Sequence, residues 1–258
     1  MCTLVVLRRP GDDWPLLLAA NRDEMIDRPW RAPGRHWPDR PEVVAGLDEL
    51  AQGSWLGLND HGVVAAILNR FGTLGPAPGQ RSRGELVLEA LDHADARDAA
   101  EALGAIEPAA YRPFNMIIAD NRDAFWLRHA DAAGRARVSV KALGTGVSMI
   151  AAGDLDEEET PRLRRYRPRF VEAPTPDPAR GDWSSWEALL SDDETTPHDG
   201  PAGAMRFITE RGFATVSSAL IALPGVGRSG VKPVFRFRAW QPEATPWRDI
   251  LAPGTATP

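Results

Sequence analysis

The first 24 residues, MCTLVVLRRPGDDWPLLLAANRDE, decide the fold that the sequence predicts. Two apolar runs, Thr3 to Leu7 and Leu16 to Ala20, flank the turn-rich segment Arg9 to Asp13. Apolar runs of strand length on either side of Pro and Gly predict two neighbouring antiparallel strands. Cys2 then precedes the first strand and Asn21-Arg22-Asp23-Glu24 ends the second, so we expect them at the same edge of a sheet.

The rest of the chain continues in blocks of strands and helices. A hairpin is predicted around Asn59-Asp60-His61-Gly62, whose residues tolerate left-handed turn conformations. The proline-rich stretch from Arg28 to Pro41 is expected to be a loop. Further strands are predicted at Ser54–Leu58, Val63–Asn69, Phe114–Ala119, Ala124–Leu127, Ala136–Val140, Val147–Ala151, Thr215–Leu223 and Val234–Trp240. Helices are predicted at Ser82–Leu91, Ala96–Leu103, Glu157–Glu172 and Trp183–Leu190. This order predicts one α+β domain over residues 1–258, a four-layer αββα sandwich of two stacked, mainly antiparallel sheets flanked by helices.

The composition argues against several classes of protein. The 258 residues are 43% hydrophobic and 26% charged, and the formal net charge of −6 argues against nucleic acid as a partner. The basic run Arg162 to Arg169 is interpreted as the solvated face of a helix. No run approaches the roughly 18 apolar residues of a membrane span, and Leu4 to Leu7 is too short for a secretory signal. Because a single cysteine forms no internal disulfide, we expect a cytoplasmic protein, and its oligomeric state is left open.

Cys2 is the first candidate for chemistry. Removal of Met1, which is favoured before a small residue, would leave Cys2 with a free α-amino group. That amine has a pKa of about 8 and a free thiol one of about 8.5, so nucleophile and base would belong to one residue. The alternative is a buried, inert thiol at the start of a strand.

The segment Ala20-Asn21-Arg22-Asp23-Glu24 is the second candidate. Because side chains alternate along a strand, either Arg22 with Glu24 or Asn21 with Asp23 would point toward a site on the first strand. An Arg near a thiol favours the thiolate, and an Asp would hold the ammonium of the new N-terminus. The alternative is an ordinary surface turn with a neutralised charge cluster.

No metal or cofactor site is predicted. The five histidines have no paired metal-ligand spacing, and a single cysteine argues against a structural zinc site. Gly225, Gly227 and Gly230 have the spacing of a dinucleotide-binding loop. However, Pro233 and a strand-like segment follow them where a helix is required, so we interpret them as a long turn.

Six segments, in chain order, carry a family resemblance. They are Met1-Cys2-Thr3, LLLAANRDE with Arg28-Pro29, GSWLGLNDHG with Val63 to Asn69, Arg83-Gly84-Glu85-Leu86, Phe114-Asn115 and Thr160-Pro161-Arg162. Together they resemble the NRDE family, which includes the transport and Golgi organisation protein 2 homologues. The resemblance covers most of the first 165 residues, and the later third matches less clearly, through Thr215 to Leu223.

Two features resemble a more distant group. The chain begins Met-Cys-Thr, and the hairpin Gly57 to Gly62 ends in Leu68-Asn69. Both are similar to the choloylglycine-hydrolase and penicillin-V-acylase branch of the N-terminal-nucleophile (Ntn) hydrolases. This resemblance implies an Ntn-hydrolase-like fold, an oxyanion-donor role for Asn69 and an amine-binding role for Asp23.

The chain departs from these amidases at two positions. They place an Arg three residues before the amine-binding Asp, where this chain has Ala20, so Arg22 would have to substitute from a different strand position. They also use a second Asn in the later half, whereas this chain has no Asn after Asn121. Asp154 or Ser148 would have to stand in for it.

The leading hypothesis is an N-terminal-cysteine amidohydrolase acting on a small amide, including amides with an apolar acyl group. Cys2, Arg22, Asp23 and Asn69 would be its catalytic residues. The alternative is a non-catalytic carrier that uses the same fold to bind a haem-like or lipid-like ligand, which the resemblance also supports. A trafficking or interaction protein is a third alternative, for which the sequence contains no motif. For the first two, the expected partner is a small molecule.

Overall fold

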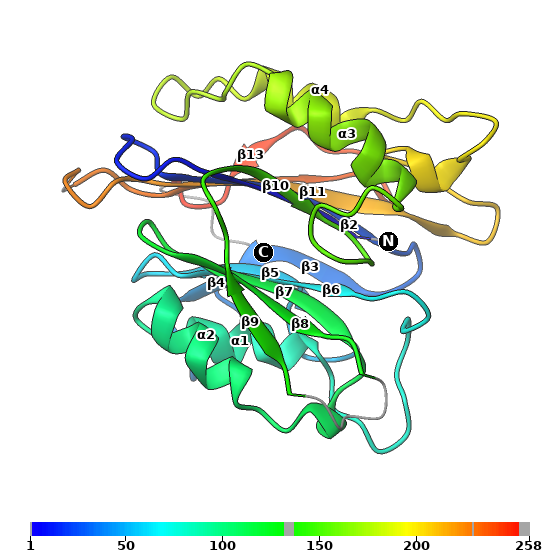
Figure 1. Cartoon of the computed structure of the whole chain (residues 1–258), viewed down its shortest axis with the longest axis horizontal. Coiled ribbons are helices and arrows are strands. Elements are labelled where there is room, and N and C mark those ends of the chain that lie inside the picture. Colours follow the sequence, from blue (N-terminus) through cyan, green and yellow to red (C-terminus); the bar gives the residue numbers. More distant parts are fainter. Residues whose placement is uncertain (1, 132–136, 229, 253–258) are drawn as a thin grey trace. The chain divides into compact units, whose positions relative to one another are not determined.

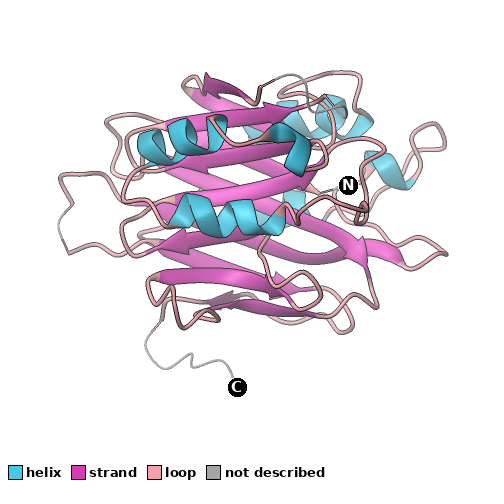
Figure 2. Ribbon diagram, turned by 90° about the horizontal axis from the view of Figure 1, so that it is seen from below, coloured by secondary structure: helices cyan, strands magenta, loops and turns pink. Residues whose placement is uncertain are grey.

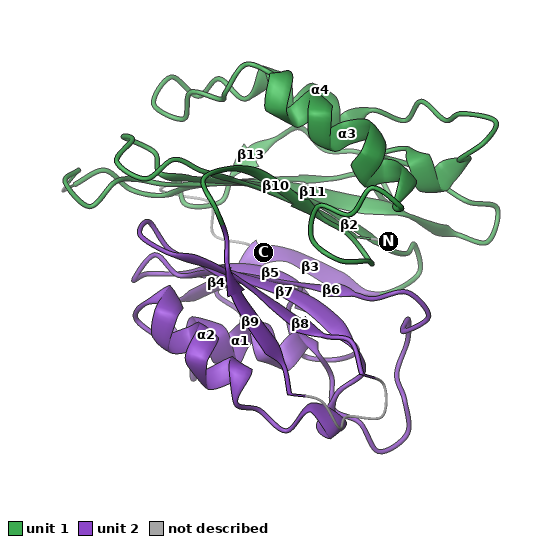
Figure 3. Cartoon of the chain, in the orientation of Figure 1, with its two compact units in different colours: residues 1–28, 144–253 green, residues 29–143, 254–258 purple. Residues whose placement is uncertain are grey.

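The structure is a computed structural model, and it describes residues 2–131, 137–228 and 230–252. The chain divides into two compact units, one made of residues 1–28 and 144–253 and the other of residues 29–143 and 254–258 (Figure 3). Each unit contains one antiparallel sheet and its own helices. Strands make up most of the regular structure (Figure 2).

The first unit is built on a six-stranded sheet in the order β10-β1-β2-β11-β12-β13. Figure 1 labels β2, β10, β11 and β13 of this sheet. Its strands are β1 (Thr3–Arg8), β2 (Leu16–Met25), β10 (Gly146–Ile150), β11 (Phe213–Leu223), β12 (Val234–Ala239) and β13 (Arg248–Asp249). Its helices are α3 (Pro161–Glu172), α4 (Ser184–Ser191) and the short 3-10 helix η2 (Pro201–Gly203). All neighbouring strands are antiparallel. The two longest strands, β2 and β11, lie side by side at the centre of this sheet.

One face of this sheet packs against α3 and α4. Alternate residues of β1 and β2 belong to the core on that face, as period-2 alternation requires. The main contributors are Val5, Leu7, Leu17, Ala19, Leu163, Tyr166, Phe170, Trp183 and Trp186. Odd-numbered residues of β2 therefore face the helices, and even-numbered residues face the opposite side of the sheet.

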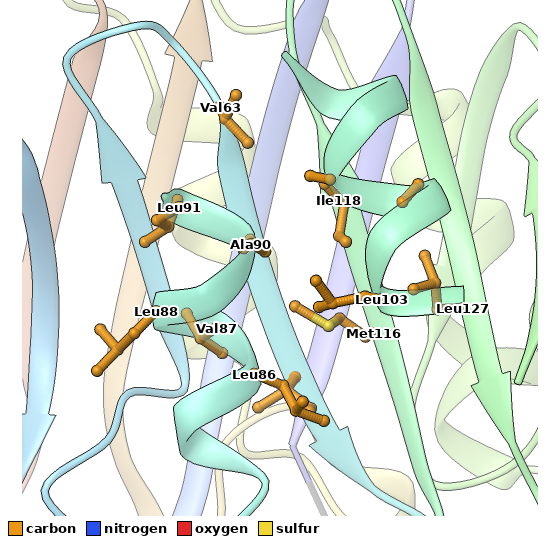
Figure 4. Packing of buried hydrophobic residues seen from close by; sticks show 14 of the residues in the cluster. Val63, Leu86, Val87, Leu88, Ala90, Leu91, Leu103, Met116, Ile118 and Leu127 are labelled. Carbon is orange, nitrogen blue, oxygen red and sulfur yellow. The ribbon is translucent and has the colours of Figure 1, made fainter. Parts of the chain in front are cut away.

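The second unit contains a seven-stranded meander in the order β3-β4-β5-β6-β7-β8-β9. Its strands are β3 (Trp30–Gly34), β4 (Val43–Asp48), β5 (Leu56–Asn59), β6 (Val64–Asn69), β7 (Phe114–Ala119), β8 (Ala124–His129) and β9 (Ser139–Ala142). Its helices are α1 (Gly84–Leu91), α2 (Ala96–Gly104) and the 3-10 helix η1 (Pro108–Ala110). Leu86 and Val87 of α1 and Leu103 of α2 pack with Met116 of β7 in one apolar core (Figure 4).

The predicted hairpin between β5 and β6 is confirmed. The Asn59 side chain accepts hydrogen bonds from the backbone N–H groups of His61 and Val63, and these bonds stabilise the turn. Gly62 has φ 90°, a conformation that a residue with a Cβ rarely adopts. β6 ends at Asn69, which pairs with Phe114 of β7.

The predicted α+β class, with two mainly antiparallel sheets flanked by helices, is confirmed. Several details differ from the prediction. β13 was not predicted, and the helix expected from Glu157 begins at Pro161 as α3. Part of the expected loop forms β3, an edge strand whose register shifts between Arg31 and Gly34, where Pro33 removes a donor. β4 was not predicted, and the strand expected from Ala136 begins at Ser139; Ala136 lies outside the described residues. The single-domain assignment stays a prediction. In the described part of the chain, no helix combines the length and apolarity that crossing a membrane requires.

Candidate active site

Cys2 directly precedes β1 and lies against the neighbouring strand β2. β1 and β2 pair with Thr3 opposite Asn21, which brings the start of one strand to the end of the other, as the sequence predicts. The backbone N–H of Asp23 donates to the Cys2 sulfur at 3.4 Å, and the thiol lies 3.6 Å from the Asp23 carbonyl oxygen, to which it donates. Cys2 as a residue remains partly exposed.

The surroundings of the Cys2 thiol keep it protonated. Burial raises the pKa of the thiol above its ordinary value, and the Asp23 carboxylate raises it further. The Asp23 N–H and the Arg22 guanidinium act in the opposite direction and do not overcome this effect. At neutral pH the nucleophile therefore needs a base to remove its proton.

The Asp23 side chain forms a buried ion pair with Arg162. Asp23 is 2% exposed and Arg162 is 1% exposed, and the Arg162 guanidinium donates to Oδ2 of Asp23 at 2.8 Å. Thr215 of β11 donates its hydroxyl to Oδ1 at 2.8 Å, so both carboxylate oxygens are bound. Arg162 also donates to the Thr3 hydroxyl at 2.7 Å. The network joins β1, β2, β11 and α3, each of which contributes one polar side chain.

A bulge in β11 accompanies this network. Thr215 pairs with Asp23, but the next pair along β11 is Ser217 with Arg22, which leaves Val216 as an extra residue. A bulge of this kind bends a strand locally and changes where its side chains point. It separates Thr215, which binds Asp23, from the regular register of the rest of β11.

The segment Asn21 to Glu24 at the end of β2 presents its side chains alternately to the two faces of the sheet. On the helix-covered face, the Asn21 amide donates to the carbonyl oxygens of Leu190 at 3.0 Å and Met205 at 2.9 Å, and it accepts from the Ser218 hydroxyl. Asn21 therefore ties β2 to the chain after α4 and η2. By alternation, Arg22 points to the opposite face, where its charge acts on the Cys2 thiol.

Asn69, the fourth predicted site residue, is half-buried at the end of β6 in the second unit. Within the part of the chain that the structure describes, its side-chain amide has no hydrogen-bond partner. The neighbouring Asn115 has a different status, since it is fully buried and its Oδ1 accepts from Arg70 at 2.7 Å and from Trp126 at 3.2 Å. The Asn69 side chain therefore differs from that of Asn115, whose oxygen is engaged by Arg70 and Trp126.

The two residues considered as stand-ins for a second Asn differ in position. Ser148 pairs with Val6 in the β1–β10 ladder, which places it roughly 13 Å along the sheet from Cys2. Asp154 follows β10, and its backbone N–H donates to Glu157 at 2.8 Å. Ser148 is therefore too far from Cys2 to replace the missing amide.

The interpretation of Arg162 to Arg169 as a solvated face is wrong for its first member. Arg162 is buried, although Arg164 is exposed and pairs with Asp199 at 3.2 Å. The signal was present in the sequence, because Arg162 lies four residues before Tyr166 and eight before Phe170, on the apolar stripe of α3. In the described residues, no group of three or more His, Cys, Asp or Glu side chains is arranged to hold a metal ion.

A family model described as "Transport and Golgi organisation 2" matches residues 1–224. The chain belongs to this family. The match includes every residue of the network just described, from Cys2 to Thr215.

Curated members of the family align over a shorter stretch. The Transport and Golgi organization protein 2 homolog of Bos taurus is 40% identical over 111 residues, and its Mus musculus counterpart is 38% identical over 110 residues. Each alignment covers 41% of this chain and 38% of the relative's own length.

Solved structures with a similar fold include one named an acylase, one named an amidase ortholog and one named a hydrolase. Penicillin V acylase from Agrobacterium tumefaciens has a TM-score of 0.57 and 15% identity, over 96% of this chain and 86% of its own. A Caenorhabditis elegans ortholog of N-acylethanolamine-hydrolyzing acid amidase has a TM-score of 0.54 and 13% identity, over 88% and 95%. A conjugated bile acid hydrolase mutant from Clostridium perfringens has a TM-score of 0.51 and 12% identity, over 97% and 92%. At these identities the likeness shows a shared fold.

Proposed function

We propose that this protein is an N-terminal-cysteine amidohydrolase that acts on a small amide with an apolar acyl group. The observation that carries the proposal is the position of the Cys2 sulfur, 3.4 Å from the Asp23 backbone nitrogen and beside a buried Asp23–Arg162 pair. A nucleophilic side chain at the second position of the chain thus lies next to charged groups that are fixed by four elements of the fold.

The mechanism requires removal of Met1, which lies outside the described residues. The new α-amino group of Cys2 then serves as the base that the protonated thiol needs. A carboxylate accepts up to about four hydrogen bonds, so Asp23 is able to bind this amine in its ammonium form in addition to Arg162 and Thr215.

The reaction proceeds in two steps. In the first, Cys2 sulfur attacks the amide carbonyl carbon, its proton passes to the α-amine and then to the leaving nitrogen, and the C–N bond breaks to give a thioester. In the second, water attacks the thioester, the α-amine takes its proton, and the acid leaves as the thiol is restored. Asn69 and backbone N–H groups would donate to the carbonyl oxygen while it carries negative charge.

The names of structures with a similar fold support amide chemistry. One is called a penicillin V acylase and another an N-acylethanolamine-hydrolyzing acid amidase. A free cysteine nucleophile also suits a reducing compartment, so a cytoplasmic location is part of this proposal.

Hydrolysis of acyl p-nitroanilides tests the proposal. We expect release of p-nitroaniline by the protein lacking Met1, no release by Cys2→Ala, and none by protein that retains Met1. Titration with haem and with a fluorescent fatty acid tests the carrier alternative in parallel. Tight binding of either ligand, with no Cys2-dependent hydrolysis, would favour the carrier.

A further inference from the structure

Ser217 of β11 is a buried polar residue in the unit that contains Cys2. It is 1% exposed, and its hydroxyl has no hydrogen-bond partner within the described part of the chain. A buried hydroxyl without a partner lowers stability, so its presence requires an explanation. The next residue, Ser218, differs, because its hydroxyl donates to Asn21 and accepts from Trp240 at 2.7 Å. Ser218 therefore has a structural role that Ser217 lacks.

The bulge in β11 places this hydroxyl where a regular strand would place an apolar side chain. Thr215 pairs with Asp23, so a regular ladder would pair Val216 with Arg22. Val216 is instead the extra residue, and Ser217 pairs with Arg22. Bulges are common beside active sites, where they change the direction of a side chain.

Ser217 and Arg22 point to the face of the sheet opposite α3 and α4. Directly paired residues project to the same face, and consecutive residues of a strand alternate. Asn21 and Ser218 bind each other on the helix-covered face, so the residues next to them, Arg22 and Ser217, point away from it. The charge of Arg22 acts on the Cys2 thiol. The Ser217 hydroxyl is therefore beside a cation that is close to the nucleophile.

The spacing of the strands indicates how far Ser217 lies from the Cys2 sulfur. The sulfur is 3.4 Å from the Asp23 nitrogen, on the β1 side of β2. β11 runs along the other side of β2, and neighbouring strands are about 4.8 Å apart. The backbone of Ser217 is therefore roughly 8 Å from the sulfur. A carbonyl group bound to the sulfur, accepting a hydrogen bond of about 2.7 Å from a serine hydroxyl, spans a distance of this order.

We infer that the Ser217 hydroxyl donates a hydrogen bond to the carbonyl oxygen of the substrate amide when Cys2 attacks it. The inference rests on the proposed function, because that function brings the reacting carbonyl to the Cys2 sulfur. A donor fixed in a buried strand stabilises the negative charge on this oxygen without reorganisation. The neighbouring Arg22 favours an anionic oxygen at the same position. The hydroxyl of Ser217 thus gains its partner when the substrate binds.

Two adjacent serines on opposite faces of one strand provide the test and its control. Ser217→Ala, Ser217→Thr and Ser218→Ala are compared with the parent in hydrolysis of decanoyl p-nitroanilide, using protein that lacks Met1. The same substitutions in the Cys2→Ala background are titrated with this anilide, which measures binding without turnover. Ser218→Ala is the matched control because it removes an identical hydroxyl that binds Asn21. Thermal melting of each variant reports the stability of the fold.

We expect Ser217→Ala to lower kcat roughly a hundredfold, as loss of one oxyanion donor predicts, and to weaken anilide binding about fivefold. Its melting temperature should stay within about 1 °C of the parent, whereas Ser218→Ala should lose about 2–4 °C and keep the parent kcat. Ser217→Thr keeps the hydroxyl and should recover most of the kcat.

A kcat of Ser217→Ala equal to that of the parent would overturn the inference and leave the proposed function standing. A fall in its melting temperature as large as that of Ser218→Ala would also overturn it, by assigning Ser217 a structural role. Absence of Cys2-dependent hydrolysis in the parent would contradict the proposed function. In that case, weaker anilide binding by Ser217→Ala alone would still support the contact, and unchanged or undetectable binding would overturn it.

Discussion

Replacing Arg162 by methionine tests the buried ion pair at the candidate site. Methionine keeps much of the length of the side chain but removes the hydrogen bonds to Asp23 Oδ2 and to the Thr3 hydroxyl. The side chains of Arg162 and Asp23 are 1% and 0% exposed, so Asp23 would become a buried charge without its guanidinium partner, while the Thr215 hydroxyl still donates to Oδ1. Removing one partner of such a pair costs about 3–5 kcal/mol.

Arg164 provides the control for this substitution. It lies two residues further along α3, its side chain is 48% exposed, and it pairs with Asp199 at 3.2 Å. An exposed pair of this kind contributes about 0–1 kcal/mol, so Arg164→Met should change stability little.

Urea unfolding followed by tryptophan fluorescence measures both free energies of unfolding. We expect Arg162→Met to lose at least about 2 kcal/mol more than Arg164→Met. The double variant Asp23→Leu with Arg162→Met should lose less free energy of unfolding than the sum of the losses of the two single variants, because no uncompensated charge remains. Should Arg162→Met prove too unstable to measure, Arg162→Lys keeps the charge and should show a smaller loss of the same sign. Losses for Arg162→Met and Arg164→Met within about 1 kcal/mol of each other would refute the reasoning.

Three further predictions concern single residues. Asn69→Ala should slow acylation of Cys2 roughly a hundredfold in single-turnover kinetics, with an unchanged melting temperature, as loss of one oxyanion donor predicts; a melting temperature that falls while acylation stays fast would instead assign Asn69 a structural role. Asn21→Ala removes the amide that donates to the buried carbonyl oxygens of Leu190 and Met205. Because these oxygens then lack that donor, the free energy of unfolding measured in urea should fall by about 2–3 kcal/mol. A loss below about 0.5 kcal/mol would contradict this. In protein that retains Met1, the raised pKa of the Cys2 thiol means that less thiolate is present at neutral pH. Alkylation by iodoacetamide should therefore be slower at pH 7 than for a free cysteine. The alkylation rate should also keep increasing at pH values where that of a free cysteine has levelled off. A pH profile that levels off at or below that of free cysteine would show that burial does not control this thiol.

The strands that local patterns define were predictable from the sequence. Thr3 to Leu7 and Leu16 to Ala20 are apolar runs with a turn between them, and they form β1 and the first part of β2. The hairpin before Asn69 was equally clear, because its turn residues have a specific conformational role. By contrast, β4 contains Gly46 and ends in a charged residue, and its short apolar run was not distinguished from loop.

The candidate site was only partly predictable, because its contacts join distant parts of the chain. The sequence predicts the meeting of Cys2 with the end of β2, since the two strands are consecutive. The pairing of β2 with β11 and the approach of α3 bring Thr215 and Arg162 to Asp23, and no local pattern encodes those contacts. Helical periodicity nevertheless places Arg162 on the buried stripe of α3, although the charge of the run is typical of a solvated face.

Covalent trapping of the acyl intermediate shows whether Cys2, with a free α-amino group, is the nucleophile of an amidohydrolase. The protein is purified from cells, incubated briefly with an acyl p-nitrophenyl ester, and measured by intact mass and by fragmentation of its N-terminal peptide. We expect a protein that lacks Met1 and carries one acyl group on the Cys2 sulfur, with no such adduct on Cys2→Ala. A protein that keeps Met1, or that takes up the acyl group equally well with and without Cys2, would contradict it.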